Sequence, residues 1–340
     1  MLRYLTAGES HGDYLTGILE GFPAGVKITP AFLAAQLKRR RQAPGRSARQ
    51  ALETDQFKII SGVSGGLTTG APISVLLANK GRALPAPSSL PRPGHADLAG
   101  MLKYDTLNAS LIRERASARE TAAGVALGAF ALRLLEMLDI GINSRVLSLG
   151  ALRQVTAESA AAELLRARKA GDTLGGVFEL TAENLPAGLG GFSQRDRRLG
   201  ARLGAALLAI NGVKGFEVGG GFGLAALGGK AASTDPDLSG GLDGGMTNGR
   251  ILRVRCAVKP VPGLPGGSPS TDLRNFRRKL SISSTSDTTA VFAAAVVAEN
   301  AAALELAGAM LEKFGGDSLG EIKTRVDEWR KRTQKILRRL

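Results

Sequence analysis

The amino-acid sequence predicts an α+β protein with a layered architecture built from two similar halves. The chain has 340 residues, of which 44% are apolar, so a sizeable core can form. Segment 61–80, "SGVSGGLTTGAPISVLLANK", aligns without gaps with segment 240–259, "GGLDGGMTNGRILRVRCAVK". In each half, strand-forming segments precede a long Ala-rich helical segment, which is the order expected of an α+β fold.

The elements follow from local patterns in chain order. Each copy of the repeat is a Gly-rich turn that runs into a strand and ends at a lysine. Upstream of the repeats, segment 17–25 resembles segment 176–188. Helices that begin at a polar cap are expected within 117–138 and 284–311, and further helices over 151–172 and 319–340. Exposed loops rich in Pro, Gly and Ser are expected over 81–94, 228–245 and 260–272.

The repeat defines the expected domain organisation. We expect a single domain over residues 1–340, made of halves of about 1–150 and 151–318 plus a C-terminal helix over 319–340. Only two copies are found, so a solenoid is excluded. Chance similarity between Gly-rich segments is the alternative explanation of the repeat.

The chain is strongly basic, with a formal net charge of +15. This charge favours anionic partners: nucleic acid, an acidic membrane surface, or small molecules that carry phosphate or carboxylate groups. Aromatic residues are only 4%, and the basic residues form separate clusters, which disfavours nucleic acid. Neither a signal-peptide core nor a run of 18 apolar residues is found. We therefore expect a cytoplasmic protein with no nucleic-acid or membrane partner.

The chain contains one cysteine, Cys256, within the strand-like segment "RILRVRCAV". A single cysteine excludes an internal disulfide and a cysteine-based metal cluster, and the pattern favours a buried strand residue. Histidine spacing typical of a metal site is also lacking, so no metal is expected.

Both histidines of the chain lie in short, turn-like segments with small neighbours. His11 stands in "AGESHG" and His95 in "RPGHADLAG". Small neighbours leave room for a ligand at the ring, and imidazole exchanges protons near neutral pH. We favour acid–base roles for both, with purely structural histidines as the alternative.

Arginines cluster in two further segments, "RRRQAPGRSARQ" (39–50) and "IRERASARETA" (112–122). Guanidinium groups in a turn can converge on one phosphate or carboxylate. In the second segment, Ser117 and Glu120 have the spacing of a helix capping box, and a helix start flanked by Arg115 and Arg119 also suits an anion. The Gly-rich turns match neither a P-loop nor a Rossmann fingerprint, so they are weak signals.

Several of these segments closely resemble motifs of the chorismate synthase family. They are "GESHG", "RPGHADLAGMLKY", "ERASARETA", "TTGAPI", "GVKGFEVGGGF", "GGMTNG…KPVP", "SDTTAV…AAVVAEN" and "LEKFGGD", in family order along the whole chain. The resemblance implies a pseudo-symmetric β-α-β sandwich with helices packed between antiparallel sheets, usually assembled as a homotetramer. It implies a lyase that eliminates phosphate from 5-enolpyruvylshikimate-3-phosphate to give chorismate. Such enzymes require reduced FMN without net redox change, and NADPH is a candidate reductant.

The resemblance also implies roles for individual residues. His11 matches the acid that meets the leaving phosphate, His95 the histidine that protonates the flavin, and Asp287 the carboxylate that acts as base with the flavin. Substrate contacts are implied for Ser10, Arg46 and Arg119, and NADP or anion contacts for Arg41 and Arg46. The positions matching flavin contacts are Arg115, Ala116, Ser117, Ala205, Ala206, Gly244, Lys259, Pro260, Val261, Pro262, Gly263 and Thr285.

The chain departs from the family pattern mainly around flavin and anion binding. Thr285 stands where the family has a flavin-contacting arginine, Gly263 where it has threonine, and loops 81–91 and 228–243 are shorter. We therefore expect weaker FMN affinity than the family norm, or a replacement cation at Arg277 or Arg278. A divergent paralogue that binds flavin or anions without catalysis is the alternative function. A nucleic-acid-binding protein is a third reading that rests only on charge.

Overall fold

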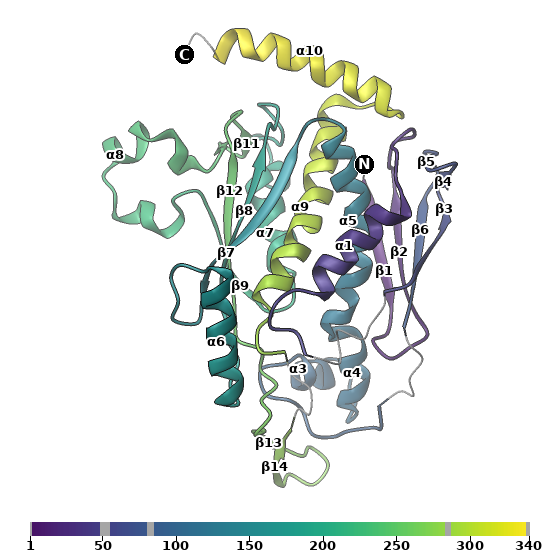
Figure 1. Cartoon of the computed structure of the whole chain (residues 1–340), viewed down its shortest axis with the longest axis vertical. Helices are drawn as coiled ribbons and strands as arrows, with labels where there is room; N and C mark the ends of the chain where they lie inside the picture. The colour runs from purple at the N-terminus through teal and green to yellow at the C-terminus, as the bar shows by residue number, and fades with distance from the viewer. Residues whose placement is uncertain (1, 48–54, 80–84, 283–286, 338–340) are drawn as a thin grey trace.

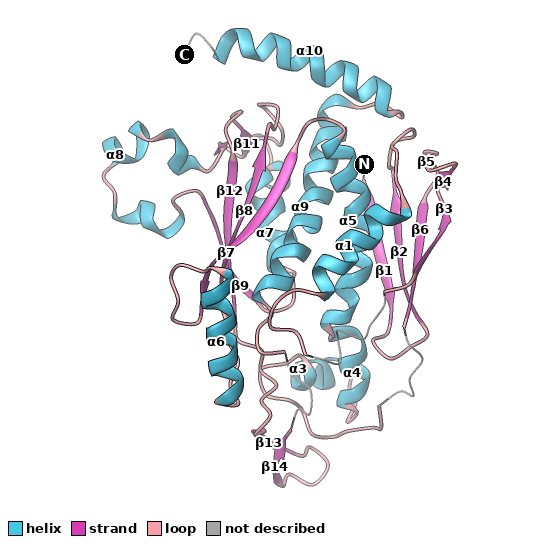
Figure 2. Cartoon of the chain, viewed as in Figure 1, coloured by secondary structure: helices cyan, strands magenta, loops and turns pink. Residues whose placement is uncertain are grey.

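The structure is a computed structural model that describes residues 2–47, 55–79, 85–282 and 287–337. Two four-stranded antiparallel sheets lie on opposite sides of a central layer of helices (Figures 1 and 2). The helices of this layer, α5 (Thr121–Glu136) and α9 (Val291–Phe314), pack against each other and against the sheets. The predicted α+β fold, a sandwich with helices between antiparallel sheets, is confirmed.

The first sheet has the strand order β1-β2-β6-β3. Its strands are β1 (Arg3–Gly8), β2 (Tyr14–Glu20), β6 (Ile73–Ala78) and β3 (Phe57–Ser61). Alternate residues of β2 and β6 are fully buried against α5, as expected of strands with one face on the core. Gly17 of β2 provides space for Leu127 of α5, since a Cβ at Gly17 would lie 2.9 Å from the Leu127 side chain.

The second sheet has the strand order β7-β8-β12-β9, which matches the first sheet position by position. Its strands are β7 (Gly141–Leu149), β8 (Gly176–Glu183), β12 (Leu252–Val258) and β9 (Val213–Val218). Before β6 and β12 come two equivalent small hairpins, formed by β4 (Val63–Ser64) with β5 (Leu67–Thr68) and by β10 (Leu242–Asp243) with β11 (Met246–Thr247). Thr68 and Thr247 donate equivalent 2.6 Å hydrogen bonds to the carbonyls of Pro23 and Pro186.

The contact between α5 and α9 depends on small residues. A Cβ at Gly128 of α5 would lie 2.5 Å from the Cβ of Asn300 on α9, so the two helices approach through a glycine. By length and composition α9 could cross a membrane, but 78% of its most apolar window is buried inside the protein. It is therefore the core helix of the sandwich. Cys256 of β12 is fully buried, as predicted, and burial raises the pKa of its thiol to about 12.

Other elements surround this core. They are α1 (Pro30–Arg41), α3 (Asp97–Lys103), α4 (Ala109–Ala116), α6 (Ala157–Lys169), α7 (Leu199–Leu208), α8 (Gly229–Thr234), β13 (Ser268–Thr271), β14 (Arg278–Ser281) and α10 (Leu319–Leu337). The prediction of plain loops was wrong in two places. Segment 228–245 contains α8, a 3₁₀ turn over Pro236–Ser239 and the β10–β11 hairpin, and β13 lies inside 260–272. α8 contains Ala, Ser and Thr, and β13 contains Ser and Thr, so these short elements form despite the Gly and Pro residues around and within them.

Candidate active site

The His11 ring is held by a buried carboxylate on α4. The Nδ1 atom of His11 lies 2.7 Å from Glu114 Oε1, and the His11 backbone N–H donates to Glu114 Oε2, also at 2.7 Å. Because a carboxylate accepts hydrogen bonds, Nδ1 carries the proton and Nε2 is left for another partner. The Glu114 side chain is 4% exposed, whereas that of His11 is 30% exposed. The imidazole thus presents one nitrogen to solvent from a fixed position.

The turn before His11 is joined to the end of α4. The Ser10 backbone N–H donates to the Glu114 carbonyl at 3.0 Å, and the Ser10 and Ser117 hydroxyls are 3.1 Å apart. Ser117 Oγ accepts from the Arg119 backbone N–H, so Ser117 caps the short 3₁₀ helix Ala118–Glu120. The Glu120 carboxylate lies 3.9 Å from the Arg115 guanidinium. Burial raises the pKa of Glu120 by more than Arg115 lowers it, so this pKa is above its ordinary value.

Arg119 belongs to a buried ion network next to this turn. It donates to the Asp55 carboxylate and, at 2.9 Å, to Asn79 Oδ1. Arg40 donates to the other Asp55 oxygen at 3.3 Å. Burial alone would raise the pKa of Asp55, but the two guanidinium groups outweigh it and hold this pKa below its ordinary value. Asn79 also donates to the carbonyls of Glu9 and Gly12, which fixes the His11 turn.

His95 lies among cations. The Arg92 and Arg113 guanidinium groups both bind the Asp97 carboxylate, at 3.1 and 2.7 Å. Burial lowers the pKa of His95 to about 4, with further lowering by Arg92, Lys259 and Arg113 against the opposing effect of Asp97. The ring is therefore neutral at physiological pH in the protein alone. An anionic ligand in this position would favour its protonation.

The segment Lys259–Gly263 leaves the end of β12 beside His95. Lys259 Nζ donates to the Gly94 carbonyl at 2.5 Å, and burial together with Lys214 lowers the pKa of Lys259. A Cβ at Gly94 would lie 2.9 Å from Pro262 Cβ, and Gly94 has a φ of 72°, so this close approach requires glycine. The Val261 carbonyl accepts from the Thr173 hydroxyl at 2.7 Å.

Asp287 is paired with Arg46. Arg46 donates to Asp287 Oδ2 at 2.8 Å, and the Ser47 backbone N–H donates to Oδ1 at 2.8 Å. The two side chains are only 9% and 10% exposed. The Nε atoms of both Arg41 and Arg46 are buried without a hydrogen-bond partner among the described residues. Both residues are predicted anion contacts, so each has a buried N–H donor that an anionic ligand could satisfy.

Hydrogen bonds connect these groups into one region. Asn211 donates to the Ala116 carbonyl, and the Lys259 backbone N–H donates to the Gly212 carbonyl. The Leu174 backbone N–H donates to the Thr288 carbonyl, next to Asp287. The structure thus links the His11, His95, Lys259 and Asp287 segments around α4 and the ends of β8 and β12.

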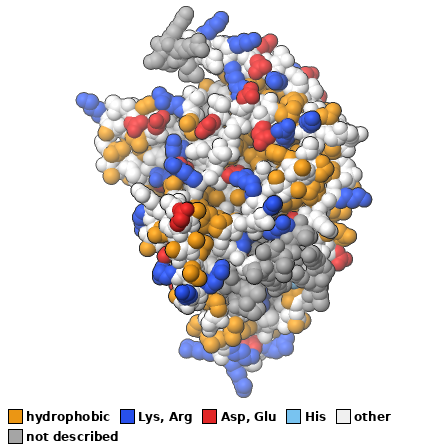
Figure 3. Space-filling view, in the orientation of Figure 1, with side chains coloured by type: hydrophobic (Ala, Val, Ile, Leu, Met, Phe, Trp, Pro, Cys, Tyr) orange, Lys and Arg blue, Asp and Glu red, His pale blue; other side chains and the backbone are white. Residues whose placement is uncertain are grey.

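Other predicted positions lie elsewhere. Gly244 is in the β10–β11 turn, before β12, whereas Lys259 follows that strand, so the length of β12 separates them. Ala205 and Ala206 lie in the last turn of α7, which ends at Leu208, three residues before Asn211. Thr285 lies outside the described residues. Arg277 and Arg278 belong to the exposed β13–β14 hairpin, at the lower tip where basic side chains gather (Figures 1 and 3).

Sequence reasoning missed three residues of this region: Glu114, Asp55 and Asn79. Glu114 stands in the recognised segment "ERASARE", directly before Arg115, which was the available signal. Asp55 and Asn79 carried no local signal, since their partners are 64 and 40 residues away in sequence. Within the described ranges, no group of three His, Cys, Asp or Glu side chains could hold a metal ion.

Comparisons with known proteins agree with this geometry. The family model of chorismate synthase matches residues 2–311. The chain belongs to the chorismate synthase family. The chorismate synthases of Moorella thermoacetica and Desulforamulus reducens are 44% and 41% identical to it, each over 99% of this chain and 100% of the relative. A crystal structure of a chorismate synthase superposes with a TM-score of 0.78 at 33% identity, covering 96% of this chain and 97% of the other.

The family assignment confirms the predicted function of a chorismate synthase, a lyase. The alignment with the Desulforamulus reducens protein spans 387 positions, more than the 340 residues of this chain, so this chain has gaps in that alignment.

Proposed function

We propose that this chain converts 5-enolpyruvylshikimate-3-phosphate to chorismate and phosphate with reduced FMN as cofactor. The reaction removes a proton and a phosphate group from the substrate, with no net change of oxidation state. The observation that carries the proposal is the His11–Glu114 pair, which fixes Nδ1 and leaves Nε2 for another partner, on a turn joined through Asn79 to the Arg119 network. A departing phosphate needs positive charge or a proton, and this arrangement supplies both.

His11 would act as the acid at the leaving phosphate by giving up the Nε2 proton of its imidazolium form, which returns the ring to the neutral Nδ1–H form. Glu114 keeps Nδ1 protonated and so fixes the orientation of the ring. Ser10 lies on the His11 turn, and Arg119 belongs to the ion network that is joined to this turn through Asn79. Both side chains would contact the anionic groups of the substrate. The tight bonding of this turn through Asn79 limits the reorganisation needed when substrate binds.

The residues present fit a reduced flavin and its phosphate. Arg41 and Arg46 have buried Nε donors with no acceptor in the part of the chain that the structure describes, and His95 lies among Arg92, Lys259 and Arg113. The residues proposed to hold the flavin are Arg115, Ala116, Ser117, Lys259, Pro260, Val261, Pro262 and Gly263. When bound, reduced FMN would supply electron density that makes loss of phosphate easier.

His95 and Asp287 would handle the protons on the flavin side. His95 is neutral in the protein alone, and it would gain a proton once an anionic cofactor offsets its cationic neighbours. Both Asp287 oxygens accept one hydrogen bond each, from Arg46 and Ser47. Each oxygen keeps a second lone pair, so the carboxylate can still accept a proton as base.

Assembly as a homotetramer in the cytoplasm is also proposed. Large apolar side chains are exposed on the outer face of the first sheet, including Leu5 at 69%, Tyr14 at 55% and Ile60 at 49%. Apolar patches of this kind mark protein–protein contacts. Light scattering should give the mass of four chains, and Leu5→Glu should reduce it.

The deciding experiment is an anaerobic assay of the purified full chain with chemically reduced FMN and 5-enolpyruvylshikimate-3-phosphate. Phosphate and chorismate should appear in equal amounts. Oxidised FMN without reductant serves as the control and should give no product, while addition of NADPH to oxidised FMN tests self-reduction. Folded, flavin-saturated protein without turnover would instead identify a non-catalytic flavin-binding paralogue.

A further inference from the structure

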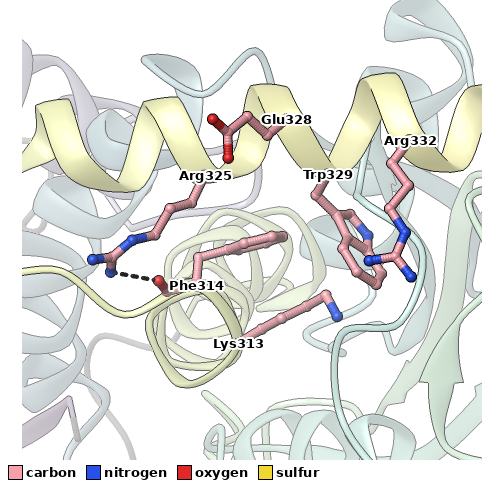
Figure 4. Close-up of a pocket in the computed structure, with 6 residues that line it drawn as sticks. All are labelled: Lys313, Phe314, Arg325, Glu328, Trp329 and Arg332. Carbon is pink, nitrogen blue, oxygen red and sulfur yellow. Dashed lines mark hydrogen bonds between the residues drawn. The ribbon is translucent and has the colours of Figure 1, made fainter.

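A basic pocket lies between the C-terminal end of α9 and helix α10, at the opposite end of the molecule from α3 and α4 (Figures 1 and 4). It is lined by Lys313, Phe314, Arg325, Glu328, Trp329 and Arg332. Three of these side chains are cationic and one is anionic. We call it the α9–α10 pocket; none of its residues belongs to the candidate active site.

Two of the cations meet at the single tryptophan of the chain. Lys313 Nζ lies 3.7 Å from the centre of the Trp329 ring, and the Arg332 guanidinium lies 5.4 Å from it. Burial lowers the pKa of Lys313, and the charge of Arg332 lowers it further. Like charges therefore accumulate on one aromatic ring, as Figure 4 shows.

Among the described residues, neither Lys313 nor Arg332 forms an ion pair with a carboxylate within 4 Å. Two acids near these residues in sequence have other partners: Glu312 pairs with Arg202, and Glu321 accepts from the Ser318 backbone N–H. Glu328 lines the pocket but is exposed to solvent. The pocket thus has excess positive charge, because its three cations outnumber its one carboxylate, Glu328.

These cations are not needed to attach α10. Trp329 Nε1 donates to the Ala187 carbonyl at 2.9 Å, and the Trp329 and Phe314 rings pack edge to face with centres 6.5 Å apart. Arg330 donates to the carbonyls of Leu138 and Asn184. Besides the Lys313–Trp329 contact, the helix is therefore docked by polar and apolar contacts that do not depend on the charge of Lys313 or Arg332.

We propose that the α9–α10 pocket binds a small oxyanion with two negative charges, such as the phosphate group of a metabolite. The ammonium of Lys313 and the fork of Arg332 supply hydrogen-bond donors of the kind that recognise phosphate. An aromatic ligand is disfavoured because Lys313 already covers the Trp329 ring. Glu328 reduces the net charge of the pocket, which nevertheless remains positive.

Trp329 provides a local reporter for the test, since no other tryptophan contributes. Inorganic phosphate is titrated into the full chain without flavin while Trp329 fluorescence is recorded, with chloride at matched ionic strength as reference. A saturable change is expected with phosphate only. Lys313→Gln and Arg332→Gln should each weaken it by about tenfold or more, as loss of a charge-assisted hydrogen bond predicts. Lys331→Gln, a neighbouring exposed lysine outside the pocket, is the matched control and should bind as the parent chain does.

Three results would overturn the assignment. They are a phosphate response equal to that of chloride, an unchanged affinity in both pocket variants, and tighter binding of benzoate, a monovalent aromatic anion, than of phosphate. Circular dichroism of each variant establishes that α10 and the core are intact, and Arg332→Gln alters an exposed side chain that should not affect folding.

Discussion

Replacing Glu114 by glutamine should change which nitrogen of His11 carries the proton. Glu114 accepts from both the backbone N–H and Nδ1–H of His11, each at 2.7 Å. Glutamine has one acceptor oxygen and one NH₂ group at the same positions. If the oxygen keeps the backbone N–H, the NH₂ group faces Nδ1, which must then act as acceptor. The ring proton moves to Nε2, and the carboxylate that favours an imidazolium is lost.

The size of the effect follows from the bond that is lost. A charge-assisted hydrogen bond contributes about 1.5–3 kcal/mol, so kcat should fall by about one to two orders of magnitude. KM should change little, because Glu114 is 4% exposed and would not contact the substrate. The anaerobic assay measures both constants. Nitrogen-15 NMR of the imidazoles reads the tautomer directly, and the chain has only two histidines to assign.

The control is Glu136→Gln, which removes an exposed carboxylate paired with Arg133 far from His11. It should leave kcat, KM and both histidine spectra unchanged. If Glu114→Gln retains kcat within about twofold and the His11 tautomer does not change, the positioning role of Glu114 is wrong. If the tautomer changes but kcat does not, the acid role of His11 is wrong instead.

Three further predictions concern charge and cofactor affinity. The His95 pKa of about 4 lies below that of the unfolded chain, so stability should fall as pH drops from about 6.5 towards 4, and His95→Gln should lose this dependence in urea unfolding. Asp55→Asn should lower the unfolding free energy by about 3–5 kcal/mol, since it leaves buried cations unpaired, whereas Asp237→Asn at an exposed pair should cost less than about 1 kcal/mol. Because the Asp55 pKa is lowered in the folded protein, ionised Asp55 stabilises the fold at pH values above its pKa in the unfolded chain, about 4. This stabilisation is lost as the pH falls below that value. Thr285→Arg should tighten FMN binding by about tenfold in a flavin titration, by restoring a charge-assisted contact.

Each of these has a contrary outcome. A His95 signal that titrates near pH 6.5 in the ligand-free protein would contradict the lowering of its pKa by burial and by its cationic neighbours. Equal losses of stability in the Asp55 and Asp237 variants would show that burial does not govern the ion network. An unchanged FMN affinity in Thr285→Arg would mean that the missing arginine is already compensated or irrelevant.

The likeness of the two halves was predictable from the repeat, whereas the strand order within each sheet was not predicted. Strands β4, β5 and β6 occupy the same places in segment 61–80 as β10, β11 and β12 do in segment 240–259. Gly-rich turns followed by β-formers give a strong local signal. The short elements α8 and β13 were missed because they lie in segments dominated by Pro and Gly, where tertiary packing decides the structure.

Site residues that stand in recognisable motifs were predictable from the sequence. Contacts between residues far apart in the sequence were not. His11 and His95 were singled out by their small neighbours, but their partners come from other parts of the chain. Glu114 is 103 residues from His11, and Asp287 is 241 residues from Arg46. Neither pairing has a sequence signature, because the two partners share no element or spacing. Only the folded chain shows that a predicted base and a predicted anion contact bind each other.

The two histidine segments are coupled through consecutive residues of α4. Arg113 binds the Asp97 carboxylate and the Leu90 carbonyl, which hold the His95 loop, and Glu114 holds His11. Successive helical side chains diverge by about 100°, so one short helix can position two loops on different sides. A displacement of α4 would therefore move His11, the proposed acid, and His95, the proposed flavin-side histidine, together. Such coupling would keep their spacing constant, which a reaction that loses a proton and a phosphate from one substrate requires.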